Sequence, residues 1–154
     1  MEPENVWDYP RPPRLERVPQ RLRVMLGHRT VADTHDGCRV LETSHPPTYY
    51  LPMSCFVCDM REAPGRSVCE WKGPARMWTL RAGGREAVGA AWNYPAPNAG
   101  FEPIRDHLAV YAARVDACFV DDEQVTPQPG AFYGGWITAN LGGPFKGGPG
   151  SLLW

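Results

Sequence analysis

Large aromatic residues gather in the middle of this sequence, where they could form the walls of a ligand-binding pocket. Trp71, Trp78, Trp92 and Tyr94 follow one another in a short stretch of chain. Trp92 and Tyr94 are two residues apart, so they share a face if they lie on a strand. Aromatic faces stack on flat rings and attract cations, but rings of this size also fill hydrophobic cores. Both interpretations stay open from the sequence.

Polar and aromatic neighbours could complete such a pocket. We expect Glu42, Tyr49, Tyr50 and Lys72 to be these neighbours. If the protein is an enzyme, Glu42 or Lys72 would carry the acid–base roles. His45 lies close to Glu42 and directly before two prolines, which makes it a further candidate for a polar role in the pocket.

The turn that joins two of the aromatic residues decides whether all four can share one site. Gly83-Gly84 is a strong signal for a two-residue hairpin turn. An ideal turn of this kind pairs Trp78 with Gly89, which places Trp78 on the face opposite Trp92. A cage that includes Trp78 therefore requires a bulge or a longer loop.

Cys55 and Cys58 form a CxxC motif, a pattern found in zinc and redox sites. A structural zinc site usually takes two such pairs, and here Cys69 and then Cys38 or a histidine would have to supply the rest. A redox CxxC begins a helix in a βαβ unit, which this sequence lacks. We therefore expect buried or half-buried thiols, no metal and no cofactor.

Other catalytic patterns are weak. Ser44 and His45 are adjacent, so on a strand they point to opposite faces and cannot act as a nucleophile–base pair. The acidic run 121–123 falls in an expected turn, and Lys146 among glycines is only a weak phosphate cradle. Nucleotidyl transfer needs carboxylates that share Mg²⁺ on one face, and we find no such pair.

Composition indicates one soluble domain rich in strands and turns. The chain has 154 residues, 17 prolines, 16 glycines and a net charge of −1. So many prolines exclude an all-helical protein, and the balanced charge argues against a nucleic-acid partner. We see no signal peptide and no apolar run long enough for a membrane helix. Five cysteines without a secretion signal favour reduced thiols and a cytoplasmic location.

The elements expected around these residues are short strands joined by turns. We expect a single domain with a proline-rich arm over 1–20, a core over 21–127 and a glycine-rich tail over 128–154, both arms lying along the surface. One or two short helical turns are expected, one of them over 101–106, and residues 107–113 and 117–120 are expected to form a hairpin. The other expected strands are residues 21–26, 29–34, 39–43, 48–50, 67–71, 76–82, 85–94 and 124–126.

Several longer motifs are similar to a known family. The motifs are residues 42–52 (ETSHPPTYYLP), 69–75 (CEWKGPA), 90–95 (AAWNYP), 111–119 (YAARVDACF) and 132–136 (FYGGW). They resemble the bacterial domain of unknown function DUF427, whose members often carry a nucleotidyltransferase-like label. The resemblance implies a β-tent fold, in which two antiparallel sheets are pinned together along one side at a steep angle.

The same fold implies a way to use the aromatic residues. Cereblon-type β-tents bind cyclic imides and uracil-like rings in a tryptophan cage, and Trp71, Trp78, Trp92 and Tyr94 occur in a similar order and spacing. Cereblon-type zinc pairs are not matched here, so zinc is not carried over. We expect a mainly β protein that binds a small flat, cyclic-imide-like or nucleobase-like ligand. The alternatives are an enzyme acting on a nucleotide-like or cyclic amide substrate, and a module whose arms dock a protein partner.

The metal expectation can be checked directly. Purified protein should contain no stoichiometric zinc, because four ligands at tetrahedral spacing are missing. Elemental analysis tests this. A content near one zinc per chain, lost together with thermal stability on chelation, would contradict it.

Overall fold

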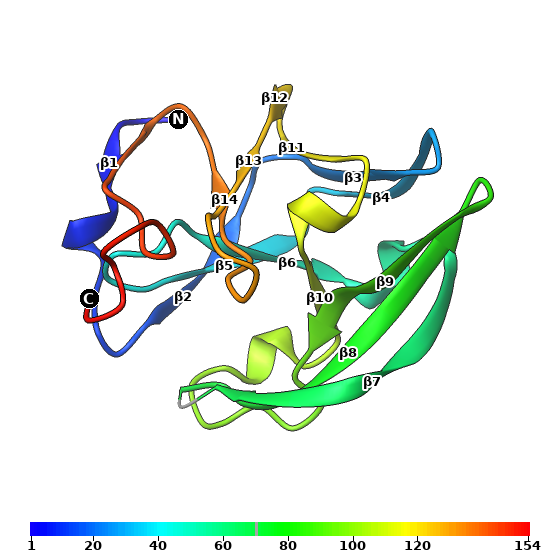
Figure 1. Cartoon of the computed structure of the whole chain (residues 1–154), viewed down its shortest axis with the longest axis horizontal. Coiled ribbons are helices and arrows are strands. Elements are labelled where there is room, and N and C mark those ends of the chain that lie inside the picture. Colours follow the sequence, from blue (N-terminus) through cyan, green and yellow to red (C-terminus); the bar gives the residue numbers. More distant parts are fainter. Residues whose placement is uncertain (70) are drawn as a thin grey trace.

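The computed structural model describes residues 1–69 and 71–154, and antiparallel sheets dominate it (Figure 1). Every neighbouring pair of strands in the larger, seven-stranded sheet is antiparallel. Its strands, in spatial order, are β2 (Arg14–Val18), β5 (Gly37–Leu41), β6 (Thr48–Pro52), β10 (His107–Val110), β9 (Arg85–Asn93), β8 (Gly73–Ala82) and β7 (Asp59–Cys69).

A smaller sheet and two short strand pairs complete the structure. The four-stranded sheet has the order β12 (Glu123–Gln124), β11 (Ala117–Val120), β3 (Leu22–Leu26) and β4 (Arg29–Thr34). β1 (Glu4–Asn5) lies parallel to β15 (Leu141–Gly142), and β13 (Thr126–Pro127) lies antiparallel to β14 (Trp136–Ile137).

Helical structure is confined to single 3₁₀ turns in the part of the chain described. There are four of them, more than the sequence indicates: η1 (Val6–Asp8), η2 (Met53–Cys55), η3 (Glu102–Ile104) and η4 (Ala112–Arg114). The predicted mainly β fold with antiparallel sheets is confirmed. No helix within residues 1–69 and 71–154 has the length and apolar character needed to cross a membrane.

The larger sheet buries side chains on both faces. On β6, Tyr49 and Leu51 point into the main core, which lies between the two sheets, whereas Tyr50 points to a second cluster on the opposite face. Trp92 and Tyr94 belong to this second cluster. Because side chains alternate along a strand, neighbouring residues serve different cores. The candidate site lies on the second face.

The two hairpins predicted at glycine turns are confirmed, and one longer-range prediction is wrong. The hairpins around Gly27-His28 and Gly83-Gly84 form as β3–β4 and β8–β9. The expected hairpin between residues 107–113 and 117–120 does not form: β10 pairs with β6 and β9, whereas β11 pairs with β3 and β12. The η4 turn between them carries the chain from the larger sheet to the smaller one. Residue 70, in the strand expected over 67–71, lies outside the described residues.

The two sheets touch where two hairpin tips meet (Figure 1). A Cβ atom added to Gly27 would collide with the main chain of Ala82, and one added to Gly83 would collide with the main chain of Gly27. Both glycines also have positive φ, +61° and +57°. A residue with a side chain would separate the tips, so glycine is required at this junction.

The N-terminal segment belongs to the sheet as well as to the surface. β2 pairs with β5 over Arg14 to Val18 and forms one edge of the larger sheet. Ahead of it, Val6 is fully buried in a small cluster with Tyr9 and Leu41. The first residues therefore help to build the fold.

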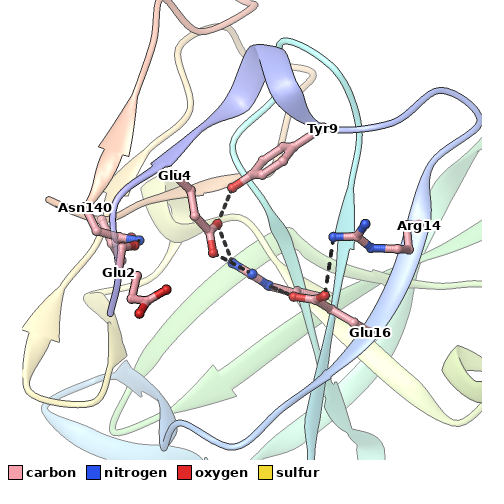
Figure 2. Close-up of polar contacts among 8 residues, drawn as sticks. Glu2, Glu4, Tyr9, Arg14, Glu16 and Asn140 are labelled. Carbon is pink, nitrogen blue, oxygen red and sulfur yellow. Dashed lines mark hydrogen bonds and ion pairs between the residues drawn. The ribbon is translucent and has the colours of Figure 1, made fainter.

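A cluster of charged side chains holds this segment in place (Figure 2). Arg39 of β5 donates to both carboxylate oxygens of Glu4, at 3.1 and 2.9 Å, and to Glu16 at 2.6 Å. The Tyr9 hydroxyl donates to Glu4 at 2.6 Å. Burial alone would raise the pKa of Glu4, but hydrogen bonds from Arg39 and Tyr9 and nearby positive charges outweigh it and lower the pKa from its usual value. Since Glu4 lies on β1, which pairs with β15, the cluster also positions the C-terminal tail.

Removing the Glu4 charge should lower stability in a pH-dependent way. Because the pKa of Glu4 is lowered on folding, its contribution is present above the ordinary carboxylate range and is lost as the pH falls through the folded pKa. We expect Glu4→Gln to cost about 1 kcal/mol at pH 7, or roughly 2–4 °C in Tm, and less at pH 3. Thermal unfolding at both pH values checks this. Glu2→Gln, at an exposed neighbour, is the control, and equal effects of the two variants would refute the assignment.

Candidate ligand-binding pocket

A cavity of about 340 Å³ opens on the second face of the larger sheet. Val40 of β5, Thr48 of β6 and Trp92 of β9 come from that sheet, and the C-terminal tail closes the opposite side. The sheet fixes the floor of the cavity, and segments outside its strands supply the rim.

Five of the eight predicted site residues line this cavity: Glu42, Trp71, Lys72, Trp92 and Tyr94. The other three lie elsewhere. Tyr50 is fully buried, with its ring centroid 6.4 Å from that of Tyr94, so it supports the wall from behind. Tyr49 points into the main core and stacks on Trp136 at 5.2 Å.

Trp78 does not join the other aromatic residues. Met77, not Trp78, is paired with Trp92, so Trp78 occupies the opposite face of the sheet. A bulge between Trp78 and Leu80 adds two residues to β9, and an even number leaves the faces unchanged. The Trp78 indole N–H donates to Asn93 at 2.8 Å. The cavity therefore has three of the four predicted rings.

The cavity wall is formed by buried rings at its base and by a partly exposed ring at its rim. Trp92 and Tyr94 are 8% and 6% exposed, whereas Trp71 is half-buried. Tyr111, just after β10, packs on Trp92 with ring centroids 4.5 Å apart. Its hydroxyl donates to the main-chain oxygen of Phe132 at 3.3 Å. The wall is thus continuous from the sheet to the tail.

Residues 128–135, here called the tail loop, cover the cavity. The loop is closed by two hydrogen bonds between Gln128 and Gly135, one main chain to main chain and one to the Gln128 side chain, both 3.0 Å. Trp136 follows the loop, is fully buried and donates its indole N–H to the main chain of β10 at 2.9 Å. Phe132 and Tyr133 project from the loop onto the cavity.

A histidine and a carboxylate lie side by side at the polar edge. His45 Nε2 is 3.7 Å from Glu42 Oε2, and Gln128 Nε2 is 3.2 Å from His45 Nδ1. Burial, together with the positive charges of Lys146 and Lys72, lowers the pKa of His45 to about 4. His45 is therefore neutral at pH 7.

The two lysines give the cavity its positive charges. Lys72 is 8% exposed, and its ammonium lies 5.7 Å from the centroid of the Tyr94 ring. Lys146 donates to the main-chain oxygen of Trp154 at 2.9 Å and lies 6.0 Å from the Tyr133 ring. Both ammonium groups thus sit against aromatic rings, an arrangement that favours cation–π attraction.

The contribution of the C-terminal tail to the cavity was not predicted from the sequence. His45 and Lys146 were only weak candidates, and Gln128, Tyr111 and Tyr133 were not singled out for the site. A usable signal was present, since residues 132–136 place two aromatic residues before two glycines and a tryptophan. Such a pattern suits a main chain that lies close to a ring.

The CxxC cysteines are away from the cavity. Cys55 and Cys58 are half-buried free thiols that pack against the main core. Burial raises the pKa of Cys55 to about 11 and also raises that of Cys58, which disfavours reactive thiolates. Among the described residues, no group of three or more histidine, cysteine, aspartate or glutamate side chains is placed to hold a metal ion.

Residues 14–121 match the sequence profile of a family described as a domain of unknown function, DUF427. The chain belongs to this family. The match confirms the family indicated by the motifs, and it spans β2 through β11. No curated protein matches the sequence. The tail loop of this DUF427 member lies beyond the matched range.

A side chain at position 134 should destabilise the protein, because the main chain of Gly134 lies against the Trp92 ring. A Cβ atom at Gly134 would collide with the ring, so Gly134→Ala should cost about 1–3 kcal/mol and change the tryptophan fluorescence. The control is Gly148→Ala, where the nearest atom to an added Cβ is 3.7 Å away. Thermal unfolding followed by fluorescence measures both. If the two variants melt at the same temperature, the tail loop does not rest on Trp92.

Proposed function

We propose that this protein binds a small flat ring, of the cyclic-imide or nucleobase kind, in the cavity under the tail loop. The observation that carries the proposal is the grouping of Trp71, Trp92 and Tyr94 around one cavity, with Glu42 and Lys72 beside them. Aromatic walls supply stacking, and the few polar groups orient the ring.

The size of the cavity supports a ligand of about one ring system. Small-molecule pockets span about 300–1,000 Å³, and about 340 Å³ lies at the lower end of that range. Trp92 and Tyr94 are held by the sheet and by Tyr111 and Tyr50 around them. A wall that is rigid before binding loses little conformational freedom when the ligand arrives.

An enzyme acting on a nucleotide-like or cyclic amide substrate is the second candidate. The juxtaposition of Glu42 and His45 at the cavity favours it, because a carboxylate beside an imidazole suits proton transfer to a bound ring. Turnover of a bound compound, followed by mass spectrometry, separates this candidate from simple binding.

We also propose that the protein is located in the cytoplasm. All five cysteines are free thiols in the structure, as expected in a reducing compartment.

Replacement of a ring at the rim should weaken binding while the fold persists. Trp71 is half-buried and lines the cavity, so Trp71→Ala should reduce affinity about 5- to 150-fold, the equivalent of about 1–3 kcal/mol of stacking. Uracil, uridine, glutarimide and a quaternary ammonium compound form the panel. Fluorescence titration measures affinity, and Tm is recorded beside each titration.

The matched control removes an indole from the other face. Trp78→Phe loses the hydrogen bond to Asn93, so it should lower Tm without changing affinity. If no compound of the panel changes fluorescence or Tm, the ring-binding function is wrong. Equal losses of affinity in the two variants would place the ligand elsewhere.

A further inference from the structure

The tail holds the side-chain amide of Gln128 in one orientation. Its Oε1 accepts the main-chain N–H of Gly135 at 3.0 Å, and its Nε2 donates to the main-chain oxygen of Lys146 at 2.9 Å. A flipped amide would set N–H against N–H and oxygen against oxygen, and both hydrogen bonds would be lost. Hence Nε2, a pure donor, faces its next neighbour.

That neighbour is His45, whose Nδ1 lies 3.2 Å from Gln128 Nε2. Since an amide NH₂ only donates, Nδ1 must accept and cannot carry a proton. The imidazole is then neutral and has its proton on Nε2. Burial and the positive charges of Lys146, Lys72 and Arg11, which lower the pKa of His45, oppose a second proton as well.

The Nε2–H of His45 faces Glu42. Nε2 and Glu42 Oε2 are 3.7 Å apart, longer than a hydrogen bond and short enough for a small shift on ligand binding to close the gap. Within the described residues the Glu42 carboxylate has no hydrogen bond, and its side chain is 23% exposed on the cavity wall. When the Nε2–H of His45 donates to one oxygen of Glu42, the remaining lone pairs of the carboxylate can accept hydrogen bonds from the ligand.

We propose that Gln128 and His45 are positioning residues that orient Glu42 to accept an N–H from the edge of the bound ring. The site therefore selects rings that carry an N–H over the same rings with N-methyl groups. This selectivity rests on the proposed ring-binding function, whereas the tautomer of His45 does not. In the enzyme alternative, Glu42 is the base, and His45 is not.

The tautomer can be read directly by NMR. In ¹⁵N-labelled protein at pH 7, long-range ¹H–¹⁵N spectra should show His45 with Nε2 protonated and Nδ1 unprotonated, assigned by comparison with His45→Gln. Gln128→Glu replaces the donor with an acceptor, so Nδ1 should gain a proton. Gln124→Glu, at an exposed position, should leave the spectrum unchanged. A protonated Nδ1 in the wild type overturns the proposal even if Gln128→Glu fails to fold.

Ring selectivity is tested with uracil and 1,3-dimethyluracil as probes. The wild type should bind uracil at least tenfold more tightly, because a hydrogen bond to a charged group is worth about 1.5–3 kcal/mol. In Glu42→Leu this ratio should fall to about one, and in Gln124→Glu it should not change. Equal affinities in the wild type refute the selectivity. Binding of neither probe overturns the selectivity, the full panel of compounds decides the ring-binding function, and the NMR result decides the role of Gln128 separately.

Discussion

Burial of the Trp136 indole is the interaction on which the candidate site depends. The side chain is fully buried, stacks on Tyr49 and donates to the main chain of Val110. Truncation of a buried tryptophan to alanine costs about 3–5 kcal/mol of unfolding free energy, a large part of the stability of a domain this size. Because Trp136 directly follows the tail loop, its burial fixes the position of Tyr133 at the cavity. The buried Trp136 thus holds the glycine-rich tail in place as one wall of the cavity.

The glycines of the tail allow its main chain to lie close to neighbouring residues, and this matters more than the flexibility they give. At Gly134 the main chain rests on the Trp92 ring, and at Gly135 it rests on Pro46 and the Gln128 side chain, so no Cβ fits at either position. Each glycine loses much conformational freedom on folding. Trp136 and the Gln128 hydrogen bonds offset that cost locally. The loop is therefore ordered by the hydrogen bonds of Gln128 together with contacts to Trp92 and Pro46 outside the loop.

Local features were predictable from the sequence, and long-range features were not. Turn residues and alternating side chains are encoded within a few positions, so the hairpins at Gly27-His28 and Gly83-Gly84 follow from them. The separation of β10 from β11 depends on pairing with strands far away in the chain. Likewise Gln128 acquires its role only when residues near 45 and 146 are brought beside it. Five residues of the site, Glu42, Trp71, Lys72, Trp92 and Tyr94, were predictable from the sequence, whereas Gln128 and the tail loop over the cavity were not.

The polar edge is built where the two ends of the chain meet. Glu42 and His45 are joined by a turn, in which the main-chain N–H of His45 donates to the main-chain oxygen of Glu42 at 3.0 Å. Ser44, within this turn, has a φ of 72°. A left-handed serine is held in place only when its surroundings determine the conformation. Here Ser44 donates its N–H to Val6 at 3.0 Å and accepts the N–H of Lys146 at 2.8 Å. Both partners lie outside residues 14–121, the range that matches the family. The matched range provides the aromatic floor, and the chain ends set the geometry of the carboxylate and imidazole above it.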